Sequence, residues 1–358
     1  MKILYAIQGT GNGHLSRARD IIPHLQRYGT VDVLVSGIQA DVDLGYSITY
    51  KLKGLSFIFG KKGGVDIVAT YKKGKLKQLW QEIKNVPVED YDIVINDFEP
   101  VSAWACILRR KVCIGLSHQA AVLNPHAPQP AVADLAGTAL LKYYAPAAKQ
   151  FGFHFKRYGD NIYTPVIRQQ VRALTPANKG HYTVYLPAYD DKRIIKVLSQ
   201  FKNIQWDVFS KHNKTKFTQG NISIQPIYNK AFIQSMATAE GVLCGAGFET
   251  PAEALYLQKK LMVIPMKGQY EQQCNAAALK KMGVPVLKSL KKKHSDKIKS
   301  WLYSKEYIQL AYPDETKEII NKVIQQYQAI ALRPAKPVNS FKKFRILLLN
   351  KLIEHLAG

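Results

Sequence analysis

The fold is decided by residues 241–255, which read GVLCGAGFETPAEAL. The apolar run at 241–244 predicts a buried strand, and the glycines after it predict a turn that leads directly into a helix. Thr250 stands where the N-cap of that helix is expected, Pro251 at its first position and Glu253 where a capping box places its carboxylate. Because the first N–H groups of a helix lack intrahelical partners and lie at the positive end of its dipole, this segment predicts an anion site.

A second segment follows about one helix and one strand later. Residues 261–265 read LMVIP and predict the next buried strand, after which a polar loop leads to the pair Glu271 and Gln272. A nucleotide-sugar site needs phosphate donors on one turn and partners for sugar hydroxyls on the next. The two segments together therefore predict a nucleotide-sugar site.

The pattern Gly-x-x-Thr-x-x-Glu-Ala-Leu, then a proline, then an acid–Gln pair two residues before Asn-Ala, resembles the donor half of a known family. It is similar to GT-B glycosyltransferases that use UDP-sugars, in particular the family 28-like group of peptidoglycan N-acetylglucosaminyltransferases and monogalactosyldiacylglycerol synthases. The resemblance implies an α/β fold of two doubly wound Rossmann-like domains that face each other across a cleft. It also implies a C-terminal helix that crosses back to the first domain.

The resemblance assigns roles to residues of the donor half. Gly247 and Thr250 are expected to meet the diphosphate, and Glu253 to accept from the ribose hydroxyls. Glu271 and Gln272 are expected to hold the sugar. The segment that contains Phe232 and Ile233 is expected to contact the uracil edge through its backbone. Glu249 departs from the pattern, because soluble members usually carry a neutral residue there.

The N-terminus carries a second glycine-rich turn, at residues 9–14, after the apolar run 3–7. Dinucleotide-binding folds open in the same way, but here His14 replaces the third glycine and the second strand ends at Ser36 rather than an acid that would hold a ribose. The Gly-x-Gly-x-Gly-His form is similar to the loop of the galactolipid synthases. The resemblance implies that the histidine lies beside the acceptor hydroxyl and that the acceptor side of the cleft includes Gly11, Asn12 and Gly13.

Glycosyl transfer to an alcohol needs a base for the incoming hydroxyl, and an imidazole titrates near the working pH, so His14 is the candidate general base. A carboxylate that orients the ring and stabilises its protonated form improves such a base. Asp97, just past the apolar run 91–96, is the first candidate, with Glu99 as the competitor and a helix-capping role for Asp97 as the alternative. His118 follows the next apolar run and is expected in the cleft, with loop capping as its alternative.

The alternation of apolar runs and helical stretches divides the chain. It predicts an acceptor-binding domain at residues 1–165, a linker at 166–180, a UDP-sugar-binding domain at 181–330 and a basic C-terminal helix at 331–358. With 358 residues and 47% hydrophobic content, the chain can bury two cores. The four cysteines lie in apolar or helical contexts and fit a reducing compartment.

The net charge of +25 predicts an anionic partner. The first basic cluster is interleaved with apolar and aromatic residues, which favours a membrane surface of anionic lipid, and no basic run carries a nucleic-acid-binding motif. No secretory signal and no run of ~20 apolar residues is visible, so we expect a cytoplasmic protein, peripheral on the cytoplasmic face of a membrane. The clusters comprise Lys51, Lys53, Lys61, Lys62, Lys72, Lys73, Lys75 and Lys77, then residues 288–299 and 341–345.

The resulting hypothesis is an inverting hexosyltransferase that uses a UDP-sugar and a lipid-linked or other hydroxyl acceptor. A UDP-sugar 2-epimerase of the same fold and a non-catalytic binder of nucleotide-sugar or nucleic acid stay open as alternatives. The string Asp41-Val42-Asp43 matches the Asp-x-Asp of metal-dependent transferases, but three-letter matches are common by chance. We therefore expect no metal and no cofactor, with the UDP-sugar as a substrate and the helix N-terminus at Thr250 stabilising the leaving diphosphate.

Overall fold

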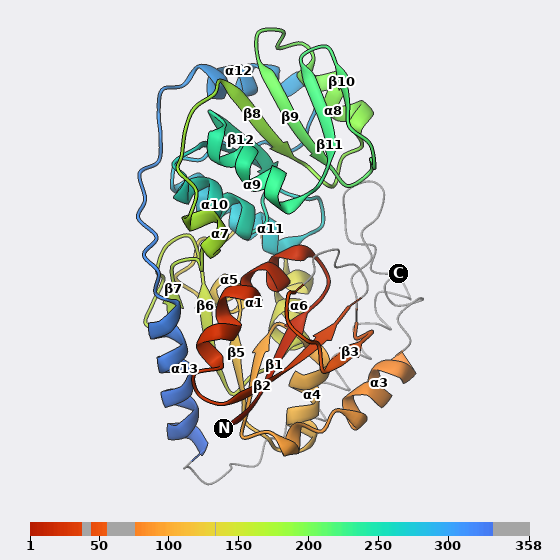
Figure 1. The fold of residues 1–358 in the computed structure, drawn as a ribbon, viewed down its shortest axis with the longest axis vertical. Coiled ribbons are helices and arrows are strands. Elements are labelled where there is room, and N and C mark those ends of the chain that lie inside the picture. The colour runs from red at the N-terminus through yellow and green to blue at the C-terminus, as the bar shows by residue number, and fades with distance from the viewer. Residues whose placement is uncertain (38–43, 56–75, 133, 332–358) are drawn as a thin grey trace.

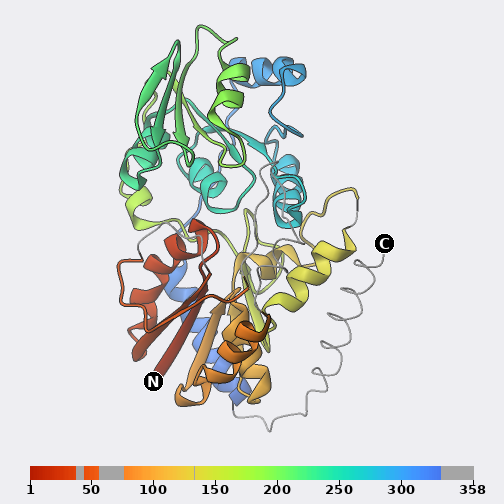
Figure 2. The same cartoon turned by 90° about the vertical axis from the view of Figure 1, so that its right-hand side faces the viewer.

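The computed structural model describes residues 1–37, 44–55, 76–132 and 134–331 (Figure 1). Two sheets lie one above the other along the long axis, and the turned view separates them as two lobes (Figure 2). We call them the N-terminal lobe, which contains strands β1–β7, and the C-terminal lobe, which contains strands β8–β13. Among the described residues, no helix is both long enough and apolar enough to cross a membrane.

The N-terminal lobe is built on a seven-stranded sheet in the order β3-β2-β1-β4-β5-β6-β7. Neighbouring strands run parallel, with Ile3 of β1 opposite Val31 of β2 and Ile93 of β4. The central strands are buried on both faces, which explains why they read as nearly continuous apolar runs. The strands are β1 (Lys2–Gln8), β2 (Thr30–Ser36), β3 (Tyr50–Leu52), β4 (Ile93–Asp97), β5 (Cys113–Leu116), β6 (Lys149–Phe153) and β7 (Ile162–Tyr163).

Helices connect these strands on both faces of the sheet. The first, α1, buries Ile21, Ile22 and Leu25 in the same apolar cluster as β1, as their spacing predicts. The helices of this lobe are α1 (Asn12–Leu25), α3 (Leu76–Asn85), η1 (Val88–Asp90), α4 (Pro100–Leu108), α5 (His118–Val122) and α6 (Leu135–Tyr144).

The C-terminal lobe repeats the architecture with a six-stranded sheet in the order β10-β11-β9-β8-β12-β13. β10 pairs antiparallel with β11, and the other pairs are parallel. The strands are β8 (His181–Tyr185), β9 (Gln205–Ser210), β10 (Phe217–Gln219), β11 (Ile222–Pro226), β12 (Gly241–Gly245) and β13 (Lys260–Ile264). The helices are α8 (Asp191–Leu198), α9 (Asn229–Thr238), α10 (Glu249–Tyr256), α11 (Tyr270–Lys281), η2 (Lys292–His294) and α12 (Ser295–Tyr303).

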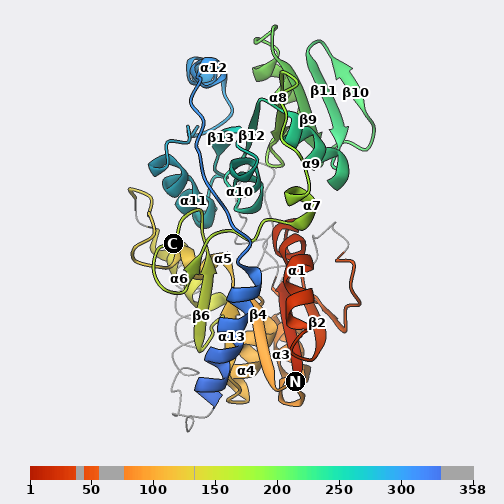
Figure 3. The same ribbon diagram turned by 60° about the vertical axis from the view of Figure 1, so that its left-hand side comes forward.

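A C-terminal helix crosses back to the N-terminal lobe, as predicted. It is α13 (Thr316–Ala331), which lies beside α1 and buries Ile319, Ile320 and Val323 (Figure 3). This helix begins well before the basic segment from which the return was predicted, because its apolar face already repeats at helical spacing. The predicted basic helix at 331–358 lies, apart from Ala331, outside the described residues.

Two stretches of chain connect the lobes. The first, residues 164–180, contains the predicted linker and the short helix α7 (Gln169–Arg172), and the second is residues 304–315. They lie side by side, because Arg172 donates to the carbonyl of Tyr312 at 2.9 Å and Gln169 donates to Asp314 at 2.6 Å. The domain boundaries placed at this linker stay a prediction.

The largest apolar cluster continues from one lobe into the other. It joins Ile95 and Phe155 of the N-terminal lobe to Phe248 and Val263 of the C-terminal lobe and to Val323 of α13. The rings of Phe155 and Phe248 meet across the lobe boundary with centroids 5.2 Å apart. The two lobes therefore pack directly against each other through this cluster.

Candidate active site

The candidate site lies where strand ends of the two lobes face each other. In the N-terminal lobe, the chain just past β1, β4 and β5 contributes side chains, and in the C-terminal lobe the chain past β12 and β13 does so (Figure 1). In open α/β sheets the carboxyl ends of parallel strands form the ligand crevice. The topology therefore brings together segments that are up to about two-thirds of the chain apart.

The glycine-rich turn after β1 places α1 at the lobe boundary. Gly11 precedes this helix with a φ of 95°, a conformation that glycine adopts without strain. A Cβ on Gly13 would stand 3.0 Å from Cγ of Glu249, so a larger residue would push against the other lobe. This turn therefore lets the two lobes approach closely.

His14, near the start of α1, contacts a buried carboxylate. Its Nδ1 lies 2.8 Å from Oδ1 of Asp97, a residue with no exposed surface. In this geometry Nδ1 carries the ring proton and donates a hydrogen bond to the carboxylate, and Nε2 is left as an acceptor. Nε2 lies 3.5 Å from Nε2 of Gln119, and the His14 side chain keeps 14% of its surface exposed. The arrangement suits a base that acts through Nε2.

Glu99, the competing carboxylate, has other partners. It caps α4 by accepting from the backbone N–H groups of Val101 and Ser102, and it also accepts from the Ser36 hydroxyl at 2.6 Å. Burial raises the pKa of Glu99 above its ordinary value. The carboxylate at His14 is thus that of Asp97, and the capping role considered for Asp97 belongs to Glu99.

Arg17 completes the cluster and was missed by sequence reasoning. Its Nη2 donates to both carboxylate oxygens of Asp97 at 2.8 Å, and its Nη1 donates to Glu249 of the C-terminal lobe. Burial would raise the pKa of Asp97, but the charges and hydrogen bonds of Arg17 and His14 hold it below its usual value. The available signal was weak: Arg17 follows His14 by three positions and so shares its helix face.

His118 lies at the lobe boundary with both ring nitrogens in contact with acceptors. Nδ1 is 2.7 Å from the carbonyl of Phe153, and Nε2 is 2.7 Å from Oδ1 of Asn275 in the other lobe. Its ring stacks on Phe248 with centroids 3.9 Å apart, and burial lowers its pKa. In this arrangement His118 connects the lobes and presents no unoccupied nitrogen to a ligand.

The donor turn differs from the predicted capping box. α10 begins at Glu249, with Phe248 at the N-cap and no side chain capping it, so Thr250 is the second helical residue and the predicted N-cap was wrong. Glu253 does not return to the helix start. Its carboxylate accepts from Nε and Nη2 of Arg168, the second at 2.7 Å, and is 2% exposed. Gly247 and Thr250 still lie at the uncapped helix end, where backbone N–H groups suit an anion.

The other predicted donor residues lie around this helix end. Glu271, in the first turn of α11, accepts from Nε2 of Gln119 at 2.9 Å, so Gln119 lies between it and His14. Gln272 accepts from the backbone N–H of Met266 at 3.0 Å. Phe232 and Ile233 both lie in α9, and each is 5% exposed. Their roles toward sugar and uracil stay predictions.

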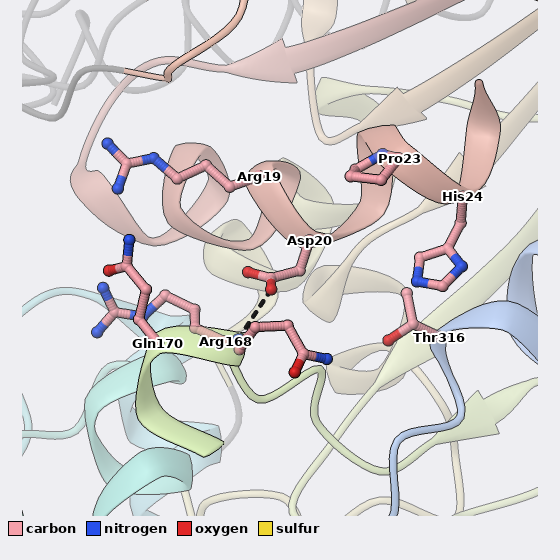
Figure 4. A pocket seen from close by; sticks show the side chains of 8 residues that line it. Arg19, Asp20, Pro23, His24, Arg168, Gln170 and Thr316 are labelled. Atoms are coloured by element: carbon pink, nitrogen blue, oxygen red, sulfur yellow. Dashed lines mark hydrogen bonds between the residues drawn. The ribbon is translucent and has the colours of Figure 1, made fainter. Parts of the chain in front are cut away.

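A cavity of about 330 Å³ lies beside the connecting segments rather than in this closed cleft (Figure 4). The backbone N–H of Gln169 donates to Asp20 across it, at 2.8 Å. The lining residues are Arg19, Asp20, Pro23, His24, Arg168, Gln169, Gln170 and Thr316. Arg168 lines this cavity and also binds Glu253 on the donor side.

Within the part of the chain that the structure describes, no group of three or more His, Cys, Asp and Glu residues is arranged to hold a metal ion. The Asp41–Asp43 string, which we attribute to chance, lies outside that part, as do five of the lysines in the first basic cluster, Lys61, Lys62, Lys72, Lys73 and Lys75.

Two doubly wound lobes with opposed strand ends define the GT-B class of two-domain α/β proteins. The chain belongs to glycosyl transferase family 1, whose family model matches residues 1–305. It is therefore a glycosyltransferase. No curated protein sequence matches it.

Solved structures share this fold over nearly the whole chain. S. aureus MnaA with UDP has a TM-score of 0.60 at 10% identity, covering 94% of this chain and 100% of that chain. Acinetobacter baumannii MurG has a TM-score of 0.55 at 14% identity, covering 90% of this chain and 99% of that chain. A UDP-N-acetylglucosamine 2-epimerase has a TM-score of 0.54 at 12% identity, with coverage of 94% and 99%. At these identities the similarity shows the fold alone.

Proposed function

We propose that this glycosyltransferase moves a hexose or N-acetylhexosamine from a UDP-sugar to a hydroxyl of a lipid-linked or membrane-associated acceptor, with inversion. The observation that carries the proposal is the His14–Asp97 pair at the lobe boundary, where Nε2 of His14 lies 3.5 Å from Gln119 and the neighbouring Gly13 packs against Glu249 of the donor turn. MnaA, a structural neighbour, is named as a complex with UDP, which supports a uridine donor.

In the proposed reaction the acceptor hydroxyl takes the place of Gln119 beside Nε2 of His14. As its oxygen attacks the anomeric carbon, Nε2 takes the hydroxyl proton, and the bond between that carbon and the β-phosphate oxygen breaks. Asp97 stabilises the imidazolium that forms. The N–H groups around Gly247 and Thr250 stabilise the charge on the departing diphosphate. A single displacement inverts the anomeric centre.

The acceptor class is inferred from surface chemistry. Val132, which precedes α6, is 80% exposed, and Leu135 and Leu140 of this helix are 77% and 37% exposed. This helix packs against α11, which begins with Tyr270 and Glu271, so its apolar face lies at the edge of the candidate cleft. Together with the net charge of +25, exposed apolar residues at this position fit an enzyme peripheral on an anionic, cytoplasmic membrane face.

The direct test is a donor screen followed by a transfer assay. UDP-GlcNAc, UDP-Gal, UDP-Glc and GDP-sugars are compared by thermal shift, and the donors that bind are then incubated with lipid and soluble acceptors. We expect stabilisation by at least one UDP-sugar and product only when an acceptor is present. A response to GDP-sugars alone would refute the donor assignment.

The 2-epimerase is the second candidate, because an epimerase of that kind shares the fold. Incubation of the enzyme with UDP-GlcNAc and no acceptor separates the two, since an epimerase forms the 2-epimer under these conditions and the proposed transferase does not. A non-catalytic binder would bind UDP and form neither product.

A further inference from the structure

One arginine joins the candidate base to the donor turn of the opposite lobe. Arg17 is 2% exposed and lies between two carboxylates, Asp97 on β4 and Glu249 at the start of α10. One guanidinium thus faces two carboxylates that belong to different lobes. Its several donors suit this task, since Nη2 donates to both oxygens of Asp97 while Nη1 donates to Glu249.

The approach of Glu249 to the N-terminal lobe is built into the backbone as well. Cγ of Glu249 packs against Gly13, where an added Cβ would stand 3.0 Å away. The Glu249 side chain therefore reaches across the lobe boundary to the first turns of α1. We call the Arg17–Glu249 pair, together with Gly13 against which Glu249 packs, the clasp.

Glu249 occupies an unusual position for a carboxylate that faces a diphosphate. It is the first residue of α10, the helix whose uncapped N-terminus is the expected phosphate site. An ionised carboxylate at that helix end repels a diphosphate unless its charge is offset by a cation or by a proton. Arg17 is shared with Asp97, so its single positive charge faces two negative ones.

The groups around Glu249 come from several elements. Burial raises its pKa to about 7, Arg17 and His14 on α1 oppose the rise, and Glu253 and Asp97 add to it. Two further neighbours, Tyr5 on β1 and Arg168 on the connecting segment, interact with it electrostatically. The Glu249 side chain keeps 17% of its surface exposed, so it can exchange a proton with solvent.

We propose that the clasp couples donor binding to the catalytic base: Glu249 takes up a proton when the diphosphate binds, and Arg17 holds Asp97, and through it His14, in register with the donor turn. Glu249 and Arg17 are in this view positioning residues. The inference rests on the proposed function, because it assumes a diphosphate at α10. The proton comes from solvent and binds a carboxylate oxygen of Glu249, and no other covalent bond changes.

Calorimetry with UDP measures this proton directly. UDP is titrated at pH 7 into the full chain in two buffers with different protonation enthalpies, for the wild type, Glu249→Gln and Glu89→Gln. Glu89 pairs with Arg109 in the N-terminal lobe, outside the cleft and the connecting segments, and provides a matched control. Because burial raises the pKa of Glu249 to about 7, we expect roughly half a proton more per UDP in the wild type and in Glu89→Gln than in Glu249→Gln.

Kinetics test the positioning role. Glu249→Gln keeps the size of the side chain and removes its charge, so it should bind UDP at pH 8 at least as tightly as the wild type. Arg17→Lys keeps the positive charge but loses the planar fork that holds Asp97, so its kcat should fall roughly tenfold or more, because small displacements of a base carry large rate penalties. A purely structural role predicts instead that donor affinity and kcat fall together.

The outcomes separate this inference from the proposed function. Equal proton uptake by wild type and Glu249→Gln, or an unchanged kcat in a folded Arg17→Lys, overturns the clasp while leaving glycosyl transfer intact. If the wild type neither binds UDP nor transfers sugar, the proposed function itself fails. Thermal unfolding of each variant confirms that it is folded before either measurement is interpreted.

Discussion

Asp97→Asn offers the sharpest test of the candidate base, because Asp97 touches both His14 and Arg17. The substitution keeps the shape of the side chain and one acceptor oxygen but removes a charge that has no exposed surface. Breaking a buried ion pair by removing one partner costs about 3–5 kcal/mol. Since Glu249 remains as a partner of Arg17, we expect a loss of unfolding free energy near the lower end, about 3 kcal/mol.

The effect on catalysis follows from the same contacts. In a serine protease triad, replacing the aspartate by asparagine lowers kcat by about 10⁴. Here Arg17 already offsets part of the Asp97 charge, so the imidazolium of His14 gains less from it. We therefore expect kcat in the folded protein to fall by roughly 10²–10³, which corresponds to about 2.7–4 kcal/mol of transition-state stabilisation.

The two effects are measured separately. Urea unfolding gives the stability change, and transfer of radiolabelled sugar at saturating donor, well below the unfolding midpoint, gives kcat. Asp90→Asn, an exposed aspartate at the opposite side of the sheet, serves as control and should change stability by less than about 0.5 kcal/mol. A folded Asp97→Asn enzyme with nearly normal kcat would show that His14 does not act as the base through this carboxylate.

Three further predictions follow from the site and its rim. His14→Ala should abolish transfer while UDP affinity, measured by calorimetry, stays within a few-fold; substantial turnover by this variant removes His14 from the mechanism. If Glu253 contacts the ribose, the wild-type enzyme should bind 2′-deoxy-UDP about 1–3 kcal/mol more weakly than UDP, and Glu253→Gln should reduce that difference. An equal difference in both proteins would show that Glu253 binds Arg168 and not the ribose. Val132→Ser combined with Leu135→Ser should reduce pelleting with anionic vesicles and activity on a lipid acceptor, but not UDP binding. Since attraction to the vesicle surface is screened over ~8 Å at physiological ionic strength, salt should release the wild type as well; pelleting that ignores both changes rejects α6 as the membrane contact.

Local patterns in the sequence were sufficient for the two strand–turn–helix units. The apolar run before Gly245 and the glycines around Gly11 specify where each strand ends, and they placed His14 and Thr250 at the correct strand ends. The helix start was misplaced because the capping pattern at Thr250 competes with the burial of Phe248, which is 5% exposed and packs across the lobe boundary. A tertiary contact thus overrode the local signal.

The partners of the buried charges could not be predicted. Arg17 and Glu249 are 232 positions apart, and Arg168 and Glu253 are 85 apart, so no local spacing pairs them. Each pairing depends on how the lobes close, which is a property of the packed chain. The sequence did indicate a carboxylate near the end of β4, but the choice between the two depends on the packed chain, in which Asp97 contacts His14 and Glu99 caps α4.

The double passage of the chain between the lobes restricts how the enzyme can open. Because residues 164–180 and 304–315 are hydrogen-bonded to each other, they act as one two-stranded connection between the lobes. Two connected segments resist twisting and sliding of the lobes more than a single segment would. We therefore expect the lobes to move mainly by rotation about these two segments. Contacts between the lobes that are far from these two segments then move furthest for a given rotation.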